Sequence, residues 1–281
     1  MKLIECPRDA MQGLPQFIPT QTKVAYLNAL LQVGFDTIDF GSFVSPKAIP
    51  QMRDTAEVLA QLQRKGSTSK LLAIVANLRG ATEAAAYQQI DCLGFPLSVS
   101  ETFQQRNTNK SIAEALQDVA QMQELCQQKG KTLVVYISMG FGNPYNDPWS
   151  AETVTEFVEQ LHHLQVSTIS LSDTIGVADP ENITRLFSSL IPAFPGIEFG
   201  AHLHTAPHNW QEKVVAAYAA GCRRFDGALR GFGGCPMAKD ELVGNMPTEN
   251  LVTYFENIGL NLGLNKQAFD EAMAQSGVIF L

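Results

Sequence analysis

The sequence predicts a closed parallel (β/α)8 TIM barrel with a short helical extension at its C-terminal end. Short runs of β-branched and other apolar residues alternate along the chain with longer segments of helical periodicity. Eight strand–helix units fit into the 281 residues at about 35 residues each, which suits this barrel. The first expected strand is not followed by a G-x-G-x-x-G turn, so the alternative of an open doubly wound sheet is less favoured.

The expected strands are short and apolar, and they span residues 3–5, 37–40, 71–76, 91–99, 133–138, 168–172, 197–202 and 224–228. The expected helices repeat apolar residues three and four apart, and they span 21–33, 54–62, 80–88, 111–128, 150–164, 180–190, 210–220 and 248–260. Ser150 and Asp179 precede two of these helices as N-caps, and Pro180 takes the first helical position. Without a linker or a change in composition, we expect one catalytic domain over residues 1–281, with a core of about 3–260 and a helical tail over 261–281.

The composition is that of a globular protein with a substantial core. Hydrophobic residues make up 45% of the chain and charged residues 17%, and the net charge of −8 argues against a nucleic-acid partner. We expect no membrane partner, because no apolar run approaches the roughly 20 residues that cross a bilayer. The N-terminus lacks signal-peptide architecture, and the five cysteines are odd in number and form no C-x-x-C pair. These features predict a reduced, cytoplasmic protein.

Polar side chains follow several of the expected strands, at the ends that meet at one mouth of such a barrel. Catalytic groups of this fold sit at those C-terminal strand ends. We therefore expect a candidate active site there. Its members, in strand order, are Glu5, Arg8, Asp9, Asp39, Ser42, Tyr136, Ser138, Asp173, His202 and His204, followed by the glycine-rich loop 230–236.

His202 and His204 stand one residue apart at the end of an expected strand, so both imidazoles point to the same side. Two such imidazoles can bind one metal ion, although a pair of hydrogen-bonded polar residues would give the same pattern. Asp9 could add a carboxylate oxygen and Asn245 an amide oxygen. This mixed nitrogen and oxygen set suits a divalent cation such as Mg²⁺ or Mn²⁺ better than structural zinc. Taken alone, Asn245 is simply part of the region that caps the last helix.

Two further features have an ordinary alternative. Arg8 beside Asp9 can be a local salt bridge, but in a barrel mouth the guanidinium could neutralise a developing oxyanion. Cys235 can be a buried structural cysteine, but its place between Gly234 and Pro236 in a glycine-rich loop favours an exposed thiol with a part in catalysis.

Together these residues resemble the 3-hydroxy-3-methylglutaryl-CoA lyase family, within the wider group of metal-dependent barrel lyases and Claisen-type synthases. The resemblance runs from Glu5 to about Leu260 in the same order and with similar spacing. The Ser-Phe-Val-Ser-Pro-Lys and Gly-Gly-Cys-Pro stretches are specific to the lyase branch. The matching stretches are 7–12, 41–47, 50–52, 171–176, 202–204, 231–236 and 244–249.

The resemblance implies roles for these residues. Asp9, His202, His204 and Asn245 would bind a divalent cation, Mg²⁺ or Mn²⁺. Arg8 would stabilise the enolate, Asp173 and His202 would take part in proton transfer, and Cys235 would assist from a flexible loop. The implied reaction is retro-Claisen cleavage of a 3-hydroxyacyl-CoA to acetyl-CoA and acetoacetate, a step of leucine degradation and ketone body formation. We also expect a homodimer, a catalytic part for Asp39, and substrate contacts from Gln12, Ser42, Tyr136, Ser138, Arg106 and Asn107.

The chain also departs from the family pattern. The usual glycine after Arg-Asp is Ala10, and the usual glutamate at the end of strand two is Asp39. After His204 the family's Asp-Thr-Tyr-Gly-x-Ala is replaced by residues 205–210, Thr-Ala-Pro-His-Asn-Trp. The acyl group is therefore open, and a 3-hydroxy-3-carboxymethyl or longer-chain acyl-CoA is an alternative. Segment 100–107 resembles a family segment that contacts CoA, but it can equally be an ordinary solvated loop.

Two other functions compete with the lyase. A Claisen synthase that joins acetyl-CoA to a 2-oxo acid would share Arg8-Asp9 and the two histidines, but such relatives are generally longer and lack Gly-Gly-Cys-Pro. A barrel without activity, used for binding, would be favoured by loss of a metal ligand, and none of the expected ligands is lost.

Overall fold

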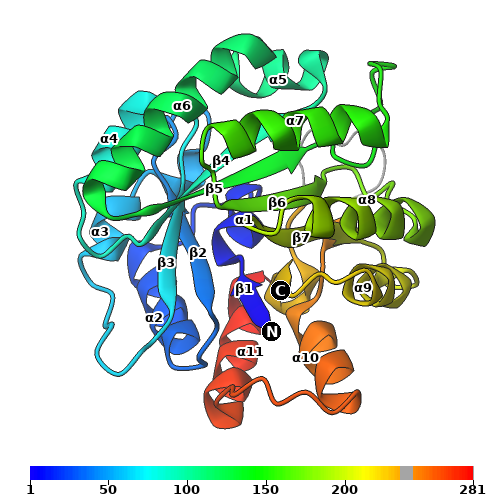
Figure 1. Cartoon of the computed structure of the whole chain (residues 1–281). Coiled ribbons are helices and arrows are strands. Elements are labelled where there is room, and N and C mark those ends of the chain that lie inside the picture. Colours follow the sequence, from blue (N-terminus) through cyan, green and yellow to red (C-terminus); the bar gives the residue numbers. More distant parts are fainter. Residues whose placement is uncertain (235–242, 281) are drawn as a thin grey trace.

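The computed structural model describes residues 1–234 and 243–280, and it confirms the predicted closed barrel (Figure 1). Strands β1 to β8 pair in chain order, all parallel, and the pairings β1–β8 and β7–β8 complete the circle. A ninth short strand, β9, adds to β7 in the antiparallel sense. The strands are β1 Lys2–Glu5, β2 Thr37–Ser42, β3 Lys70–Ile74, β4 Cys92–Ser98, β5 Thr132–Ser138, β6 Thr168–Asp173, β7 Glu198–Thr205, β8 Arg224–Gly227 and β9 Gly244–Asn245.

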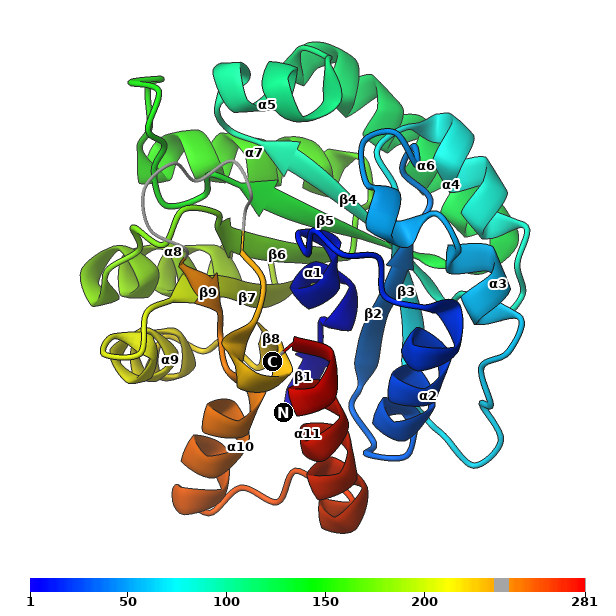
Figure 2. The ribbon, with the colours of Figure 1, turned by 180° about the vertical axis from the view of Figure 1, so that it is seen from behind.

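Helices cover the outside of this barrel, as both views show (Figures 1 and 2). The α-helices are α1 Pro7–Gln12, α2 Thr20–Leu31, α3 Thr55–Leu59, α4 Leu78–Ala85, α5 Glu101–Thr108, α6 Ile112–Lys129, α7 Ala151–His163, α8 Pro180–Ala193, α9 Trp210–Ala219, α10 Thr248–Asn257 and α11 Lys266–Phe280. Two short 3₁₀ turns are η1 Pro50–Met52 and η2 Leu229–Gly231.

The expected strands and helices are present, with shifted ends. The two predicted caps are confirmed: the side chain of Ser150 accepts a hydrogen bond from the amide of Thr153, and that of Asp179 accepts one from Asn182. Besides the two 3₁₀ turns, the short elements α1, α5 and β9 were not expected from the sequence. They lie beside the mouth of the barrel, where short polar segments carry little hydrophobic periodicity.

Two glycines make room for large side chains inside the barrel. A Cβ atom on Gly94 would lie 3.1 Å from Cε2 of Tyr136 and 2.5 Å from Cδ1 of Ile74. A Cβ atom on Gly200 would lie 2.9 Å from Cδ of Arg224. These positions therefore require glycine for close packing, and they let Tyr136 reach upward into the mouth.

The C-terminal tail is an integral part of the packing. Helix α11 lies beside α2 (Figure 2). The rings of Tyr26 and Phe280 meet edge to face at 6.1 Å. Arg230, after β8, donates to Ser276 on α11 at 3.0 Å. The tail thereby buttresses the loop that follows the last barrel strand.

No helix within the described residues is both long and apolar enough to cross a membrane. The four cysteines that the structure describes, Cys6, Cys92, Cys126 and Cys222, are buried and unpaired by disulfides.

Candidate active site

A cavity of about 440 Å³ opens at the C-terminal ends of the barrel strands. One side of it is polar and includes Arg8, Asp9, His202 and His204. The opposite wall is largely apolar, since it is formed by Val44, Ala48, Ile49, Ile74, Ala76, Pro96 and Phe103. A cavity with converging polar groups and one apolar wall is the ordinary form of a small-molecule site.

Arg8, on helix α1, is fixed between the carboxylates of Asp9 and Asp39. The helix starts directly after β1, with Pro7 at its first position, so Arg8 and Asp9 stand at the barrel mouth. The Nη2 atom of Arg8 donates to Asp39 at 2.6 Å, and its Nη1 atom donates to Asp9 at 2.9 Å. Nη1 also donates to Gln12 at 2.7 Å, and the Arg8 residue is only 7% exposed. The guanidinium is therefore held in one place, as a group that meets a developing charge must be.

The two histidines point to the same side of β7, as their spacing predicts. Their ring centroids are 5.3 Å apart. One ligand atom from each of Asp9, His202 and His204 lies within 4.8 Å of the others. The Nδ1 atom of His204 donates to the carbonyl oxygen of Thr174 at 3.0 Å, because a carbonyl can only accept. Its Nε2 atom is buried and has no hydrogen-bond partner within the described part of the chain. An orphaned imidazole nitrogen beside a carboxylate and a second imidazole fits a metal ion.

The electrostatics favour the same arrangement. Burial raises the pKa of Asp9, but the charges of Arg8, His202 and His204 outweigh burial and lower this pKa below its ordinary value. Burial, and next the proximity of His202, lowers the pKa of His204 to about 4, so this imidazole is neutral and can ligate. Burial raises the pKa of Asp39 to about 6, although Arg8 opposes the shift.

Asn245 reaches the site through β9. The register of β9 against β7 places Asn245 opposite His204. Its amide nitrogen donates to Asp9 at 2.8 Å and to the carbonyl oxygen of Phe232 at 2.9 Å. These two bonds use both N–H groups of the amide. The expected part of its carbonyl oxygen as a metal ligand stays a prediction.

Five of the expected site residues do not line the cavity, namely Glu5, Asp39, Ser42, Asp173 and Asn245. The carboxylate of Asp173 is buried in an ion pair with Lys213 at 2.7 Å and also accepts from the amide of Ala178. The hydroxyl of Ser42 donates to the carbonyl oxygen of Ile74 and accepts from Val44, so it holds the chain after β2. Neither side chain lines the cavity. The expected roles of Asp173 in proton transfer and of Ser42 in substrate contact stay predictions.

The remaining expected substrate contacts line the cavity: they are Gln12, Tyr136, Ser138, Arg106 and Asn107. The ring of Tyr136 packs edge-on against His202 at 5.6 Å. Segment 100–107 is not a loop, because residues 101–108 form helix α5, which Ser100 caps, but Arg106 and Asn107 are exposed. Arg106 lies over the ring of Tyr145 at 4.8 Å, at the rim of the cavity.

Cys235 lies outside the described residues, so its expected catalytic part stays a prediction. The three glycines that precede it, Gly231, Gly233 and Gly234, all have positive φ. A Cβ atom on Gly233 would lie 2.6 Å from the amide nitrogen of Asn245. Glycine is therefore required where this segment passes the site.

The sequence interpretation did not single out Lys213, Thr174 or Asp226. Lys213 is fully buried and donates to Asp173, to Gly176 and, at 2.8 Å, to the carbonyl oxygen of His204. Asp226 accepts from Nδ1 of His202 at 3.2 Å. Asp226 had a sequence signal, because it alternates with apolar Phe225 in a strand and so shares one side with Arg224. Thr174 acts through its backbone, which side-chain identity does not reveal.

Comparisons with known proteins agree with this geometry. The family model described as HMGL-like matches residues 3–275. Hydroxymethylglutaryl-CoA lyase YngG of Bacillus subtilis is 35% identical over 92% of this chain and 87% of its own length. The (R)-citramalyl-CoA lyase of Chloroflexus aurantiacus is 31% identical over 93% of this chain and 85% of its own length.

A solved structure has the same fold. An HMG-CoA lyase from Acinetobacter baumannii, in complex with coenzyme A and 3-methylmalate, superimposes with a TM-score of 0.91 at 32% identity. The match covers 99% of this chain and 90% of that one. The chain therefore belongs to the HMGL-like family, which confirms both the family and the carbon–carbon lyase class predicted from the sequence.

Proposed function

We propose that this chain cleaves 3-hydroxy-3-methylglutaryl-CoA to acetyl-CoA and acetoacetate in a reaction that depends on a divalent cation. The observation that carries the proposal is the cluster of Asp9, His202 and His204 next to the buried guanidinium of Arg8, in a cavity with one apolar wall. The names of the relatives above support the acyl-CoA substrate.

Asp9, His202 and His204, with the amide oxygen of Asn245, would hold the cation. The fit rests on the unpartnered Nε2 atom of His204 and on the lowered pKa of Asp9. Oxygen and imidazole donors suit Mg²⁺ or Mn²⁺. When bound, such a cation supplies Lewis acidity that lowers the pKa of a substrate hydroxyl.

Arg8 would stabilise the enolate that forms when the C2–C3 bond breaks. Its side chain lines the cavity, and its hydrogen bonds to Asp39 and Asp9 fix its orientation before substrate arrives. A preoriented cation of this kind needs no reorganisation as charge develops. The part of Asp39 is then to hold Arg8, and its one-methylene-shorter side chain still reaches the guanidinium at 2.6 Å.

Cys235 would assist in protonating the enolate carbon, and His202 would contribute to proton transfer by holding the cation that acidifies the substrate hydroxyl. His202 lines the cavity, and although burial lowers its pKa, the bond and charge of Asp226 outweigh burial and raise it. A more basic imidazole is also a stronger ligand for a cation. Because Asp173 is engaged by Lys213, we propose that it acts indirectly, by holding the segment that binds His204.

Arg106 and Asn107 would contact the CoA moiety at the rim, while Gln12, Tyr136 and Ser138 would contact the acyl group. The apolar wall would accommodate the methylene groups of the thioester arm. The Ser42 hydroxyl would act by holding the chain after β2.

A citramalyl thioester is the second candidate substrate, because a relative of that name is as similar to this chain as several hydroxymethylglutaryl-CoA lyases. Residues 205–210 differ from the usual lyase pattern and directly follow His204 at the end of β7, although none of them lines the cavity. The synthase and binding-barrel alternatives have less support, since the compared relatives are named lyases and the ligand cluster is complete.

We further propose a single catalytic domain over residues 1–281, a homodimer, a cytoplasmic location and a place in leucine degradation and ketone body formation. The location is proposed from the unpaired cysteines that the structure describes, and the other three proposals are extended from the family membership. Light scattering coupled to gel filtration tests the dimer, which a monomer mass would contradict.

A paired product assay tests the function. Purified protein is treated with chelator, and acetoacetate release from hydroxymethylglutaryl-CoA is then followed with a coupled dehydrogenase, with and without Mg²⁺ or Mn²⁺. A parallel assay follows pyruvate release from citramalyl-CoA. Cation-dependent acetoacetate release supports the proposal. Pyruvate release faster than acetoacetate release would make citramalyl-CoA the preferred substrate. Release of neither product would refute lyase activity on either thioester.

A further inference from the structure

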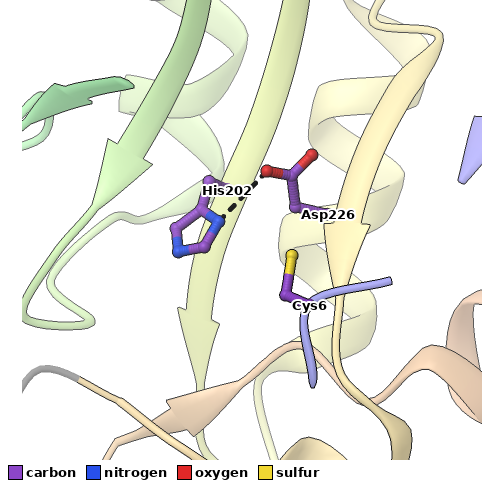
Figure 3. A group of neighbouring side chains, drawn as sticks. All are labelled: Cys6, His202 and Asp226. Atoms are coloured by element: carbon purple, nitrogen blue, oxygen red, sulfur yellow. Dashed lines mark hydrogen bonds and ion pairs between the residues drawn. The ribbon is translucent and has the colours of Figure 1, made fainter. Parts of the chain in front are cut away.

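Asp226 lies on β8 directly beside His202 of β7. The two strands pair at Ala201 and Phe225, so the next residue of each strand is His202 and Asp226. The carboxylate oxygen Oδ2 is 3.2 Å from Nδ1 of His202, and Figure 3 shows one edge of the imidazole turned toward this carboxylate. The contact therefore follows from barrel register.

The burial of Asp226 is costly for folding. The residue is 2% exposed, and its second oxygen, Oδ1, has no hydrogen-bond partner among the residues that the structure describes. A buried carboxylate with an unsatisfied oxygen destabilises a fold compared with an apolar residue of similar size. Among the residues that the structure describes, its carboxylate has a hydrogen bond only with His202, so its contribution is to that imidazole.

The bond decides which nitrogen of His202 is available. An ionised carboxylate can only accept a hydrogen bond, so Nδ1 carries the proton and Nε2 keeps its lone pair. His204 has the same arrangement, with the carbonyl oxygen of Thr174 in place of the carboxylate. Both rings would then offer Nε2 to a cation. The partners of the two Nδ1 atoms differ in charge. That of His202 is a carboxylate, and that of His204 is a neutral backbone carbonyl.

We propose that Asp226 is a positioning residue of the cation site, which fixes the orientation and the Nδ1–H tautomer of His202 so that Nε2 binds the cation. The proposal rests on the cation site proposed above. Partners of metal-bound histidines in other proteins change metal affinity by about 10–100-fold when they are removed.

Cys6 lies beside His202 and Asp226, and these three residues could in principle form a second metal site, which the geometry disfavours. Ligand atoms of Cys6, His202 and Asp226 lie within 4.8 Å of one another, as a second metal site would require. On this side His202 presents Nδ1, which already donates to Asp226 and so has no lone pair for a metal. The thiol of Cys6 donates toward the carbonyl oxygen of Ile4, and burial together with the nearby carboxylates raises its pKa well above the ordinary value. Cys6 therefore packs against the pair as a neutral thiol.

Two measurements on the full chain test the proposal. Mn²⁺ affinity is measured by calorimetry on the wild type, Asp226→Ala and Asp226→Asn. The tautomer of His202 is measured in the metal-free protein at alkaline pH by ¹⁵N-imidazole spectra, assigned with His202→Gln. Asp54→Asn is the matched control, because Asp54 is also a buried carboxylate in an ion pair, with Lys23, and lies outside the cation cluster.

Asp226→Ala should weaken Mn²⁺ binding by about 10–100-fold. Asp226→Asn should stay close to the wild type, because an amide oxygen accepts the same bond, and Asp54→Asn should not change the affinity. The wild type should show the Nδ1–H tautomer at His202, and Asp226→Ala should lose it. Unchanged affinity in Asp226→Ala, equal losses in both variants, or an Nε2–H tautomer in the wild type would overturn the proposal. Absence of Mn²⁺ binding by the wild type, with the tautomer as expected, would instead refute the cation site.

Discussion

Lys213→Met should lower the free energy of unfolding by about 3–5 kcal/mol, because it leaves a buried carboxylate without its cation. The side chains of Lys213 and Asp173 are 1% and 0% exposed, and their charged atoms are 2.7 Å apart. The ammonium group also donates to the carbonyl oxygens of Gly176 at 3.1 Å and His204 at 2.8 Å. Methionine has similar length and apolar volume, so the loss reports on charge and hydrogen bonds.

Urea denaturation followed by circular dichroism measures this change. Lys266→Met is the control, because Lys266 is 79% exposed and pairs with Glu256 on the surface, where a pair contributes at most about 1 kcal/mol. The double variant Asp173→Asn/Lys213→Met removes both charges and should recover part of the loss. If Lys213→Met stays within about 1 kcal/mol of the wild type, the buried-pair reasoning is refuted.

Three further predictions concern the site and its support. Arg8→Gln should reduce turnover by about 10²–10³-fold or more while circular dichroism stays unchanged, and near-normal rates would remove its role in stabilising the enolate. Cys235→Ser should lose only part of the turnover, and unchanged kinetics would leave Cys235 without a catalytic part. Glu5 has its pKa raised by burial from 4.5 to about 8, against the opposing bonds from Thr248 and Leu229. The folded state thus binds this proton more tightly than the unfolded state, and the resulting stability is fully present below pH 4.5 and lost as pH rises through about 8. Glu5→Gln should therefore lose less stability than the wild type between pH 5 and 9 in denaturation experiments, and parallel pH profiles would contradict the shift.

The barrel was predictable because its strands and most of its helices carry strong hydrophobic periodicity. Strand β2 is buried at every position, and helix α8 buries Ile183, Leu186, Phe187 and Leu190 on one face. Helices α1 and α5 were not predicted, since they are short and polar. What fixes α1 is the proline at its first position and the tertiary contacts of Arg8, neither of which gives a periodic pattern.

The site was predictable where a motif and a strand end coincide, as at His202 and His204. Their spacing alone places both rings on one side, and Asp9 and Asn245 were nominated with them as oxygen donors, in agreement with the resemblance. The partners of these residues were harder to predict, because Asp226, Lys213 and the carbonyl of Thr174 come from other segments and depend on the register between strands. Asp173 also follows the pattern of a mouth residue, but the sequence did not reveal its buried ion pair with Lys213.

The central claim is that Asp9, His202 and His204 hold one divalent cation beside Arg8. Electron paramagnetic resonance titration of Mn²⁺ tests it most directly, on the wild type, His204→Ala and the control His163→Ala, which alters an exposed histidine of α7. One tightly bound Mn²⁺ per chain is expected in the wild type and in His163→Ala, and loss of tight binding is expected in His204→Ala. Equal binding by all three proteins, or no binding by the wild type, would contradict it.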